Sequence, residues 1–126
     1  INKAIKVSNK TKKPMLLFFT GSDWCGWCIR LQKEVLKTPE FAKWATKNVV
    51  LVELDFPRGK QQSDIIKKQN NDLQQIFGIQ GFPTVWFATA NVKSGKPSYT
   101  GIGNTGYVAG GPTAWLNVAN GILKNK

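Results

Sequence analysis

The sequence contains no histidine and only two cysteines, Cys25 and Cys28, which are separated by two residues. A structural zinc site needs four ligands, usually cysteine or histidine. One copy of this chain therefore does not supply a zinc site by itself, although a site shared between two chains or completed by an external thiol stays open. Because both cysteines lie in one motif, the cysteine count does not indicate the compartment.

Long hydrophobic runs are also missing. No apolar stretch approaches the roughly 20 residues that a bilayer-spanning helix needs, so we expect no membrane span. The 126 residues are 41% hydrophobic, which fits one ordinary domain over residues 1–126. The chain starts at Ile1 rather than at methionine, which is compatible with a secreted mature domain.

Acidic residues are scarce: 7 Asp and Glu stand against 18 Lys and Arg, which gives a net charge of +11. Residues 1–13 carry lysines and no acid, and no acid follows Leu73. Such an excess can favour nucleic acid, an anionic membrane or acidic proteins. No stripe of basic residues alternates with exposed aromatics, so we interpret the charge as a solvated surface and expect no nucleic-acid partner.

The two cysteines follow a short apolar run, residues 15–20, that is bounded by Pro14 and Gly21 and is typical of a buried strand. The residues after Cys28 predict a helix to about residue 37, because apolar side chains recur at helical spacing: Ile29, Leu31, Val35 and Leu36. The cysteines therefore lie at a strand-to-helix junction, in the first turn of the helix.

This junction suits thiol chemistry. Residues three apart on a helix are neighbours, so Cys25 and Cys28 can form a disulfide with little movement. The positive end of the helix stabilises a thiolate, which favours Cys25 as the attacking group. Cys28 shares the face of Leu31 and Val35, so we expect it to be buried and to resolve the intermediate. An inert disulfide is the alternative, but its closed loop is too short to stabilise the fold much.

The rest of the chain alternates helical and strand patterns. We expect strands near residues 15–20, 49–55, 84–89 and 98–102, and helices near 1–13, 25–37, 63–77 and from Pro112. Thr38-Pro39-Glu40 is a helix start signal, either of a separate helix or of a kinked continuation. We expect loops over residues 91–97 and 101–111, which are polar or rich in glycine.

Apolar spacing also predicts which faces are buried. Residues 49–55 are nearly continuous in apolarity, as in a central parallel strand. The helix over 63–77 would bury one face, formed by Ile65, Ile66, Gln69, Leu73, Ile76 and Phe77. The last helix would bury another, formed by Trp115, Leu116, Ala119, Ile122 and Leu123.

Two motifs resemble the thioredoxin superfamily over roughly the whole chain: Trp24-Cys25-Gly26-Trp27-Cys28 after a buried strand, and Gly81-Phe82-Pro83-Thr84 before another. The longer phrase at residues 19–28 is similar to a secreted bacterial subgroup of DsbH-like periplasmic oxidoreductases and DsbD-type thioredoxin-like domains. The resemblance implies an α/β thioredoxin fold, with a four-stranded mixed sheet and helices on both faces.

The resemblance also implies the function. We expect a thiol-disulfide oxidoreductase, most simply a reductase, in which Cys25 and Cys28 exchange disulfides with protein substrates. The Phe82–Pro83 bond would be cis, and the residues expected to face the substrate are Trp24, Gly26, Trp27, Phe82 and Pro83. No metal or organic cofactor is needed. The expected partners are protein thiols or disulfides and a redox partner, for a periplasmic or otherwise extracytoplasmic bacterial monomer.

Two departures from thioredoxin leave questions open. Thioredoxin has a buried aspartate six residues before its first cysteine, where this chain has Phe19. Glu53 is the nearest candidate to replace it, but we favour a Glu53 that faces solvent or pairs with a lysine. Gly26-Trp27 differs from the Gly-Pro of thioredoxin, so the direction of electron flow does not carry over. A disulfide isomerase and a binding module without turnover remain the alternatives.

Overall fold

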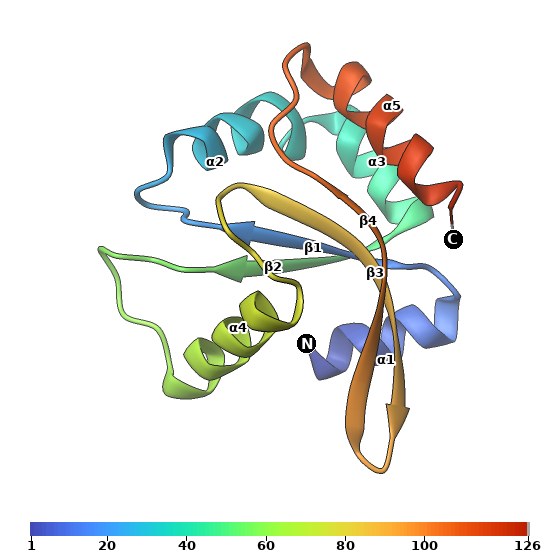
Figure 1. Cartoon of the computed structure of the whole chain (residues 1–126). Helices are drawn as coiled ribbons and strands as arrows, with labels where there is room; N and C mark the ends of the chain where they lie inside the picture. Colours follow the sequence, from blue (N-terminus) through green and yellow to red (C-terminus); the bar gives the residue numbers. More distant parts are fainter. Residues whose placement is uncertain (126) are drawn as a thin grey trace.

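The computed structural model describes residues 1–125 (Figure 1). Its strands are β1 Met15–Thr20, β2 Val50–Asp55, β3 Thr84–Lys93 and β4 Lys96–Thr105. Its helices are α1 Asn2–Thr11, α2 Gly26–Leu31, α3 Pro39–Asn48, α4 Asp64–Ile76 and α5 Gly111–Leu123, with a π-helical turn η1 at Gln32–Leu36.

The four strands form one mixed sheet in the order β2-β1-β3-β4. Strand β1 pairs in parallel with β2 and antiparallel with β3, and β3 pairs antiparallel with β4. Helices cover both faces, as expected: α2, α3 and α5 on one side of the sheet, and α1 and α4 on the other (Figure 1). All six residues of β1 are buried, so this strand fixes the position of the junction that follows it.

Successive side chains of β1 enter two separate cores, because strand residues alternate between the faces of a sheet. Leu16 and Phe18 pack with α3 and α5, where Trp115 is fully buried. Leu17 and Phe19 pack on the opposite face against the α1 and α4 side. The predicted apolar face of the last helix is confirmed by this first core.

Helix α2 does not run straight to residue 37. It passes into the π-helical turn η1, and Lys37 ends the helical segment. Thr38 then caps a separate helix, since its side chain accepts the backbone N–H of Phe41 at 3.3 Å and Pro39 follows at the first helical position. The start signal at Thr38 therefore begins a new helix, which settles the alternative left open by the sequence.

The hairpin between β3 and β4 is longer than predicted. The expected loops over residues 91–97 and 101–111 are wrong in part, because strand pairing continues to Lys93, resumes at Lys96 and extends to Thr105. Only Ser94 and Gly95 form the turn, both with positive φ (54° and 77°), as tight hairpins require. This hairpin extends past α1 (Figure 1), so its residues stay exposed and their polar composition hid the strands.

Two predicted burial patterns are also wrong. Strand β2 is an edge strand rather than a central one, and both Leu51 and Glu53 are exposed. In α4, Leu73 is buried as expected, but three isoleucines of the predicted face are exposed: Ile65, Ile66 and Ile76. Asn70 is buried instead, because its side-chain amide donates to the backbone oxygen of Asp55 at 2.9 Å.

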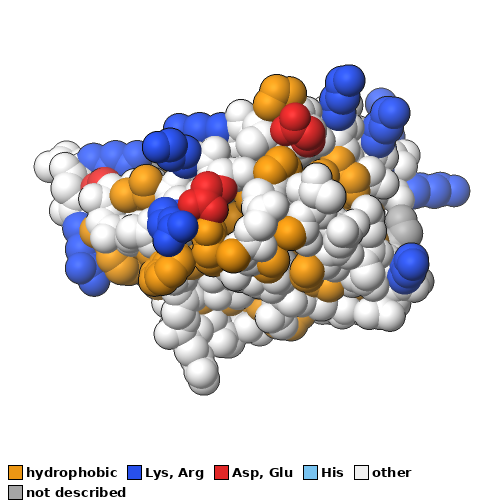
Figure 2. Space-filling view, turned by 90° about the horizontal axis from the view of Figure 1, so that it is seen from above, with side chains coloured by type: hydrophobic (Ala, Val, Ile, Leu, Met, Phe, Trp, Pro, Cys, Tyr) orange, Lys and Arg blue, Asp and Glu red, His pale blue; other side chains and the backbone are white. Residues whose placement is uncertain are grey.

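Within residues 1–125, no helix combines the length and the apolarity needed to cross a bilayer. On the face that Figure 2 shows, most Lys and Arg side chains lie towards the outline, and one lies further in, beside an acidic side chain and among apolar ones.

Candidate active site

Cys25 and Cys28 lie where β1 passes into α2, as predicted. Cys25 has an extended backbone and caps the helix just before its first turn, and its Sγ accepts the backbone N–H of Cys28 at 3.2 Å. The two residues form a disulfide with a Cα–Cα distance of 5.2 Å. Cys25 is 7% exposed and Cys28 is fully buried, so Cys25 is the outer sulfur of the pair.

The turn before Cys25 is tied to the end of β2. The Asp55 carboxylate accepts the Ser22 backbone N–H at 2.9 Å and its hydroxyl at 2.5 Å. The Asp23 carboxylate accepts the backbone N–H groups of Arg58 and Gly59 at 3.0 and 2.7 Å. These two N–H donors are the main reason that the pKa of Asp23 lies below its usual value. Loops far apart in the sequence thus hold the cysteine turn in place.

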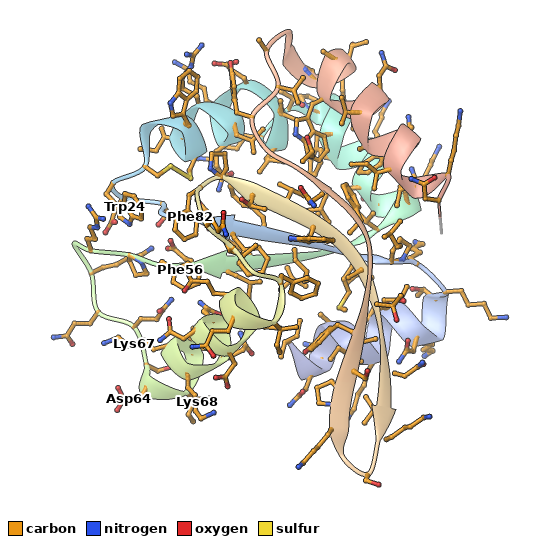
Figure 3. All side chains as sticks on the ribbon, viewed as in Figure 1. Trp24, Phe56, Asp64, Lys67, Lys68 and Phe82 are labelled. Atoms are coloured by element: carbon orange, nitrogen blue, oxygen red, sulfur yellow. A yellow bond between two sulfur atoms is a disulfide. The ribbon has the colours of Figure 1, made fainter. Side chains whose placement is uncertain are left out.

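Trp24 is held on several sides. Its indole Nε1 donates to the backbone oxygen of Phe56 at 2.6 Å, and the Arg58 guanidinium lies over its ring, 3.9 Å from the centroid. The Phe82 ring meets it edge-on at 5.7 Å (Figure 3). Gly21 leaves room for the indole, since a Cβ there would come within 2.2 Å of the ring. Trp24 is therefore a fixed wall beside Cys25.

The segment with Phe82 and Pro83 closes the same side of the site. The Phe82–Pro83 peptide bond is cis, as the resemblance implies. The Phe82 ring also lies 5.3 Å from the ring of Phe56, so three aromatic rings from three separate segments meet beside the cysteine turn (Figure 3). The structure thus brings Trp24, Phe82 and the cysteines together at one end of the sheet.

Trp27 lies on the other side of the cysteines and is 54% exposed. Its ring lies 5.0 Å from that of Tyr107, and the Arg30 guanidinium lies over both rings. Arg30 pairs with Glu34 at 3.0 Å, and the Tyr107 hydroxyl also donates to Glu34. The Tyr107 hydroxyl, followed by Arg30, lowers the pKa of Glu34. Gly26 is exposed and has open space around its Cα, which leaves the cysteine turn accessible from outside.

Sequence reasoning missed Arg58 and Tyr107. Tyr107 lies in the glycine-rich segment predicted as a loop, and Arg58 lies between the strand predicted at residues 49–55 and the helix predicted at 63–77. The sequence offered two hints: Tyr107 is an aromatic residue in a glycine-rich segment, and Arg58 is a lone arginine after a strand. The position of neither residue in the sequence shows which part of the site it contacts. Their contacts with Trp24 and Trp27 arise only when the chain folds.

A family model described as a thioredoxin-like domain matches residues 1–103. The chain belongs to the thioredoxin-like family. It is 34% identical over 121 residues to the disulfide bond reductase DsbH of Chlamydia pneumoniae, a match that covers 96% of this chain and 69% of that protein. A solved structure of DsbH oxidoreductase aligns with a TM-score of 0.86 and 30% identity, over 99% of this chain and 82% of that chain.

The C-terminal domain of Neisseria meningitidis DsbD in its oxidised form is also similar, with a TM-score of 0.61 over 99% of this chain and 92% of that domain. Its 18% identity supports the fold alone. The fold is therefore thioredoxin-like. Together with the disulfide of Cys25 and Cys28, family membership makes this chain a thiol-disulfide oxidoreductase.

The buried acid of thioredoxin has no counterpart at the corresponding position of this family member. Phe19 is fully buried there, among apolar side chains of the core on the α1 and α4 side. Glu53 is exposed, which confirms the interpretation favoured from the sequence. It lines a cavity that contains Phe18 and Leu51 but not Cys28. Neither residue supplies an acid beside the buried cysteine.

A separate cavity of about 420 Å³ does reach Cys28. Its lining residues are Thr20, Ser22, Cys28, Ile29, Gln32, Lys33 and Lys37. Within residues 1–125, no group of three or more His, Cys, Asp or Glu side chains is placed to hold a metal ion. The polar side chains that share this cavity with Cys28 therefore carry two hydroxyls, an amide and two amines rather than carboxylates.

Proposed function

We propose that this chain reduces disulfides in other proteins, with Cys25 as the nucleophile and Cys28 as the resolving thiol. The observation that carries the assignment is the position of the two sulfurs. Cys25 caps α2, where the backbone N–H of Cys28 points at its Sγ from 3.2 Å, and Cys28 is fully buried behind it. Backbone N–H groups at a helix start stabilise a thiolate at Cys25.

The substrate surface would be formed by the residues around Cys25. Trp24 and Phe82 make a rigid aromatic wall on one side, and Trp27 extends an exposed ring on the other. Gly26 leaves the approach open, and Pro83 keeps the segment after Phe82 beside the cysteines. An extended peptide that carries the target disulfide would lie across these groups, with the backbone of Phe82 as a hydrogen-bonding partner.

The direction of electron flow is supported by the relative from Chlamydia pneumoniae, which is named a disulfide bond reductase. A periplasmic or otherwise extracytoplasmic place of action fits both this similarity and that to DsbD. We expect a monomer that needs no metal or organic cofactor and receives electrons from a dithiol partner protein. Fractionation of the native bacterium tests the place of action, and recovery with the cytoplasmic fraction would contradict it.

Trapping tests the two roles. Cys28→Ser should attack a substrate disulfide and accumulate as a mixed disulfide, because no second thiol remains to release it. Cys25→Ser should form almost none, since its remaining thiol is buried. Iodoacetamide should label Cys25 of the reduced protein first. Mixed disulfides trapped by Cys25→Ser, or faster labelling of Cys28, would reverse the assignment.

Two assays separate the alternatives. A reductase accelerates the reduction of insulin by dithiothreitol, whereas a binding module without turnover does not. An isomerase restores activity to scrambled ribonuclease. A reduction potential of the Cys25–Cys28 pair near that of thioredoxin, about −270 mV, supports a reductase, and one near that of DsbA, about −120 mV, indicates an oxidant.

A further inference from the structure

The buried sulfur of Cys28 needs a route for its proton. If Cys28 resolves the mixed disulfide, as proposed above, its thiol must lose a proton before the sulfur attacks, and it must regain one when the pair is next reduced. Cys28 is fully buried, and the 7%-exposed Cys25 lies between it and the substrate side. The substrate itself covers that side in the mixed disulfide, so the proton needs another path.

The cavity beside Cys28 offers that path. Its volume of about 420 Å³ greatly exceeds the space that a single water needs, roughly 30 Å³. Polar groups from two elements line it: Thr20 and Ser22 at the end of β1, and Gln32 and Lys33 on the helical side. The wall of the cavity is mostly apolar but carries these polar groups, and a roomy cavity with a few polar partners can hold water, whereas a purely apolar one stays dry.

The Thr20 hydroxyl is buried without a hydrogen-bond partner in the protein. The side chain is fully buried, and within residues 1–125 Oγ1 of Thr20 is the one buried side-chain oxygen or nitrogen atom that makes no hydrogen bond. Buried polar groups in native proteins nearly always have a partner in the protein or in water. Thr20 and Cys28 line the same cavity, so a water held there can bond to this hydroxyl next to the thiol.

The charged groups around the cavity do not offer a simpler acceptor. Lys33 and Lys37 line it, and neither is a carboxylate that could accept the proton. The Asp55 carboxylate reaches the cavity only through Ser22, whose hydroxyl it accepts at 2.5 Å, and it pairs with Lys60 at 3.4 Å. Glu53 lines the neighbouring cavity, which Cys28 does not enter.

We propose that the cavity lined by Thr20 and Cys28 is the proton path of the resolving thiol, and that Thr20 positions the proton-carrying water at Cys28. During resolution the Cys28 proton leaves through this water to solvent, and the Cys28 sulfur attacks Cys25 Sγ. The bond between Cys25 and the substrate sulfur breaks, the Cys25–Cys28 bond forms, and the departing substrate thiolate takes a proton from solvent. The protein dithiol thereby gives two electrons to the substrate disulfide.

Thr20→Val tests the role, because valine has nearly the same shape and lacks the hydroxyl. Reduced protein is mixed with oxidised glutathione, quenched with acid at intervals, and weighed by mass spectrometry to follow the mixed disulfide and its resolution. Attack should keep its wild-type rate. Resolution should slow about tenfold at neutral pH, and its pH midpoint should rise by about one unit, since tenfold corresponds to one pH unit.

Two controls separate proton transfer from packing. Thr20→Ser keeps the hydroxyl and should restore most of the resolution rate, while Thr89→Val makes the same change at an exposed position of β3 and should alter neither step. Thr20→Val should unfold at nearly the wild-type temperature, because no protein group loses a hydrogen bond when the Thr20 hydroxyl is removed.

A Thr20→Val variant with the wild-type resolution rate and pH midpoint would overturn the proton path, as would a Thr20→Ser variant equally slow. Neither result would contradict the assignment of Cys25 as the nucleophile and Cys28 as the resolving thiol. That assignment would be contradicted if Cys28→Ser accumulated no mixed disulfide with oxidised glutathione.

Discussion

The guanidinium of Arg58 lies 3.9 Å from the centroid of the Trp24 ring, and Trp24 directly precedes the reactive Cys25. Among residues 1–125, the ion pairs involve Arg30, Lys60 and Lys68, and Arg58 takes part in none of them. Its charge is therefore available to a substrate. The backbone N–H of Arg58 bonds to Asp23, a contact that survives a change of the side chain.

Arg58→Gln should weaken reactions with disulfides that have an acidic neighbour. We expect kcat/KM to fall about two- to fivefold for a peptide disulfide flanked by Asp or Glu, with little change for one flanked by Ser, because exposed charge pairs contribute modestly. Steady-state kinetics with the two peptides measures the difference. Lys96→Gln, which removes a charge at the distant hairpin turn, is the matched control. An equal loss for both peptides would show that Arg58 acts only by holding Trp24.

Gly21→Ala should displace Trp24. The added Cβ would lie 2.2 Å from the indole, well inside contact distance, so the ring must move. We expect a loss of about 1–3 kcal/mol in the free energy of unfolding, typical of overpacking, together with slower insulin reduction. Gly121→Ala in α5 meets no atom within 4 Å and should be neutral or slightly stabilising. Denaturant unfolding of both variants checks this, and an unchanged Gly21→Ala would contradict the packing of Trp24.

Tyr107→Phe should raise the pKa of Glu34 towards its usual value of 4.5, because the Tyr107 hydroxyl is the main group that lowers it. The pKa should stay below that value, since Arg30 still pairs with Glu34. Titration of the Glu34 side chain by NMR measures the change. Tyr99→Phe, at a hydroxyl that does not contact Glu34, should leave the titration as it is in the wild type. A Glu34 that titrates normally in the wild type would remove the basis of this prediction.

Asp23→Asn should destabilise the protein in a pH-dependent way. The folded pKa of Asp23 is lowered by the N–H groups of Arg58 and Gly59, so its carboxylate stabilises the fold fully above the unfolded value of 3.8. That contribution disappears as the pH falls through the lower folded pKa. The difference in melting temperature between wild type and Asp23→Asn should therefore be largest near neutral pH and vanish in strong acid. A difference in melting temperature that persists undiminished in acid would show that the substitution changes the packing at residue 23 rather than its charge.

Local sequence patterns predicted the centre of the site well. The cysteine pair at a strand-to-helix junction needs only the apolar run before it and the helical spacing after it, and both lie within one stretch of chain. The resemblance at Gly81-Phe82-Pro83-Thr84 added the segment across from it. Arg58 and Tyr107 were missed because their partners Trp24 and Trp27 lie more than 30 residues away in the sequence, and no local period records such contacts.

Burial was harder to predict where an element is only partly covered. In α4, apolar spacing selected Ile65 and Ile76, yet the sheet contacts a narrow stripe that includes Leu73 and Asn70. The amide of Asn70 is buried because it bonds to the end of β2, a role that a hydrophobic pattern does not reveal. Strand β2 was assigned to the centre from its composition, but within residues 1–125 β1 is the strand that pairs with it, and β2 forms the edge of the sheet.

The open edge of β2 has a consequence for association between copies of this chain. An edge strand presents unpaired backbone groups that can join a second sheet, and Leu51, 55% exposed, adds an apolar side chain to that edge. Glu53 lies two residues further along the same strand, exposed and charged. Its carboxylate must be desolvated before another strand can dock there. Glu53→Val should consequently aggregate at concentrations where light scattering shows the wild type to stay dispersed. That result would mean that the Glu53 charge prevents edge-to-edge association and takes no part in the redox chemistry.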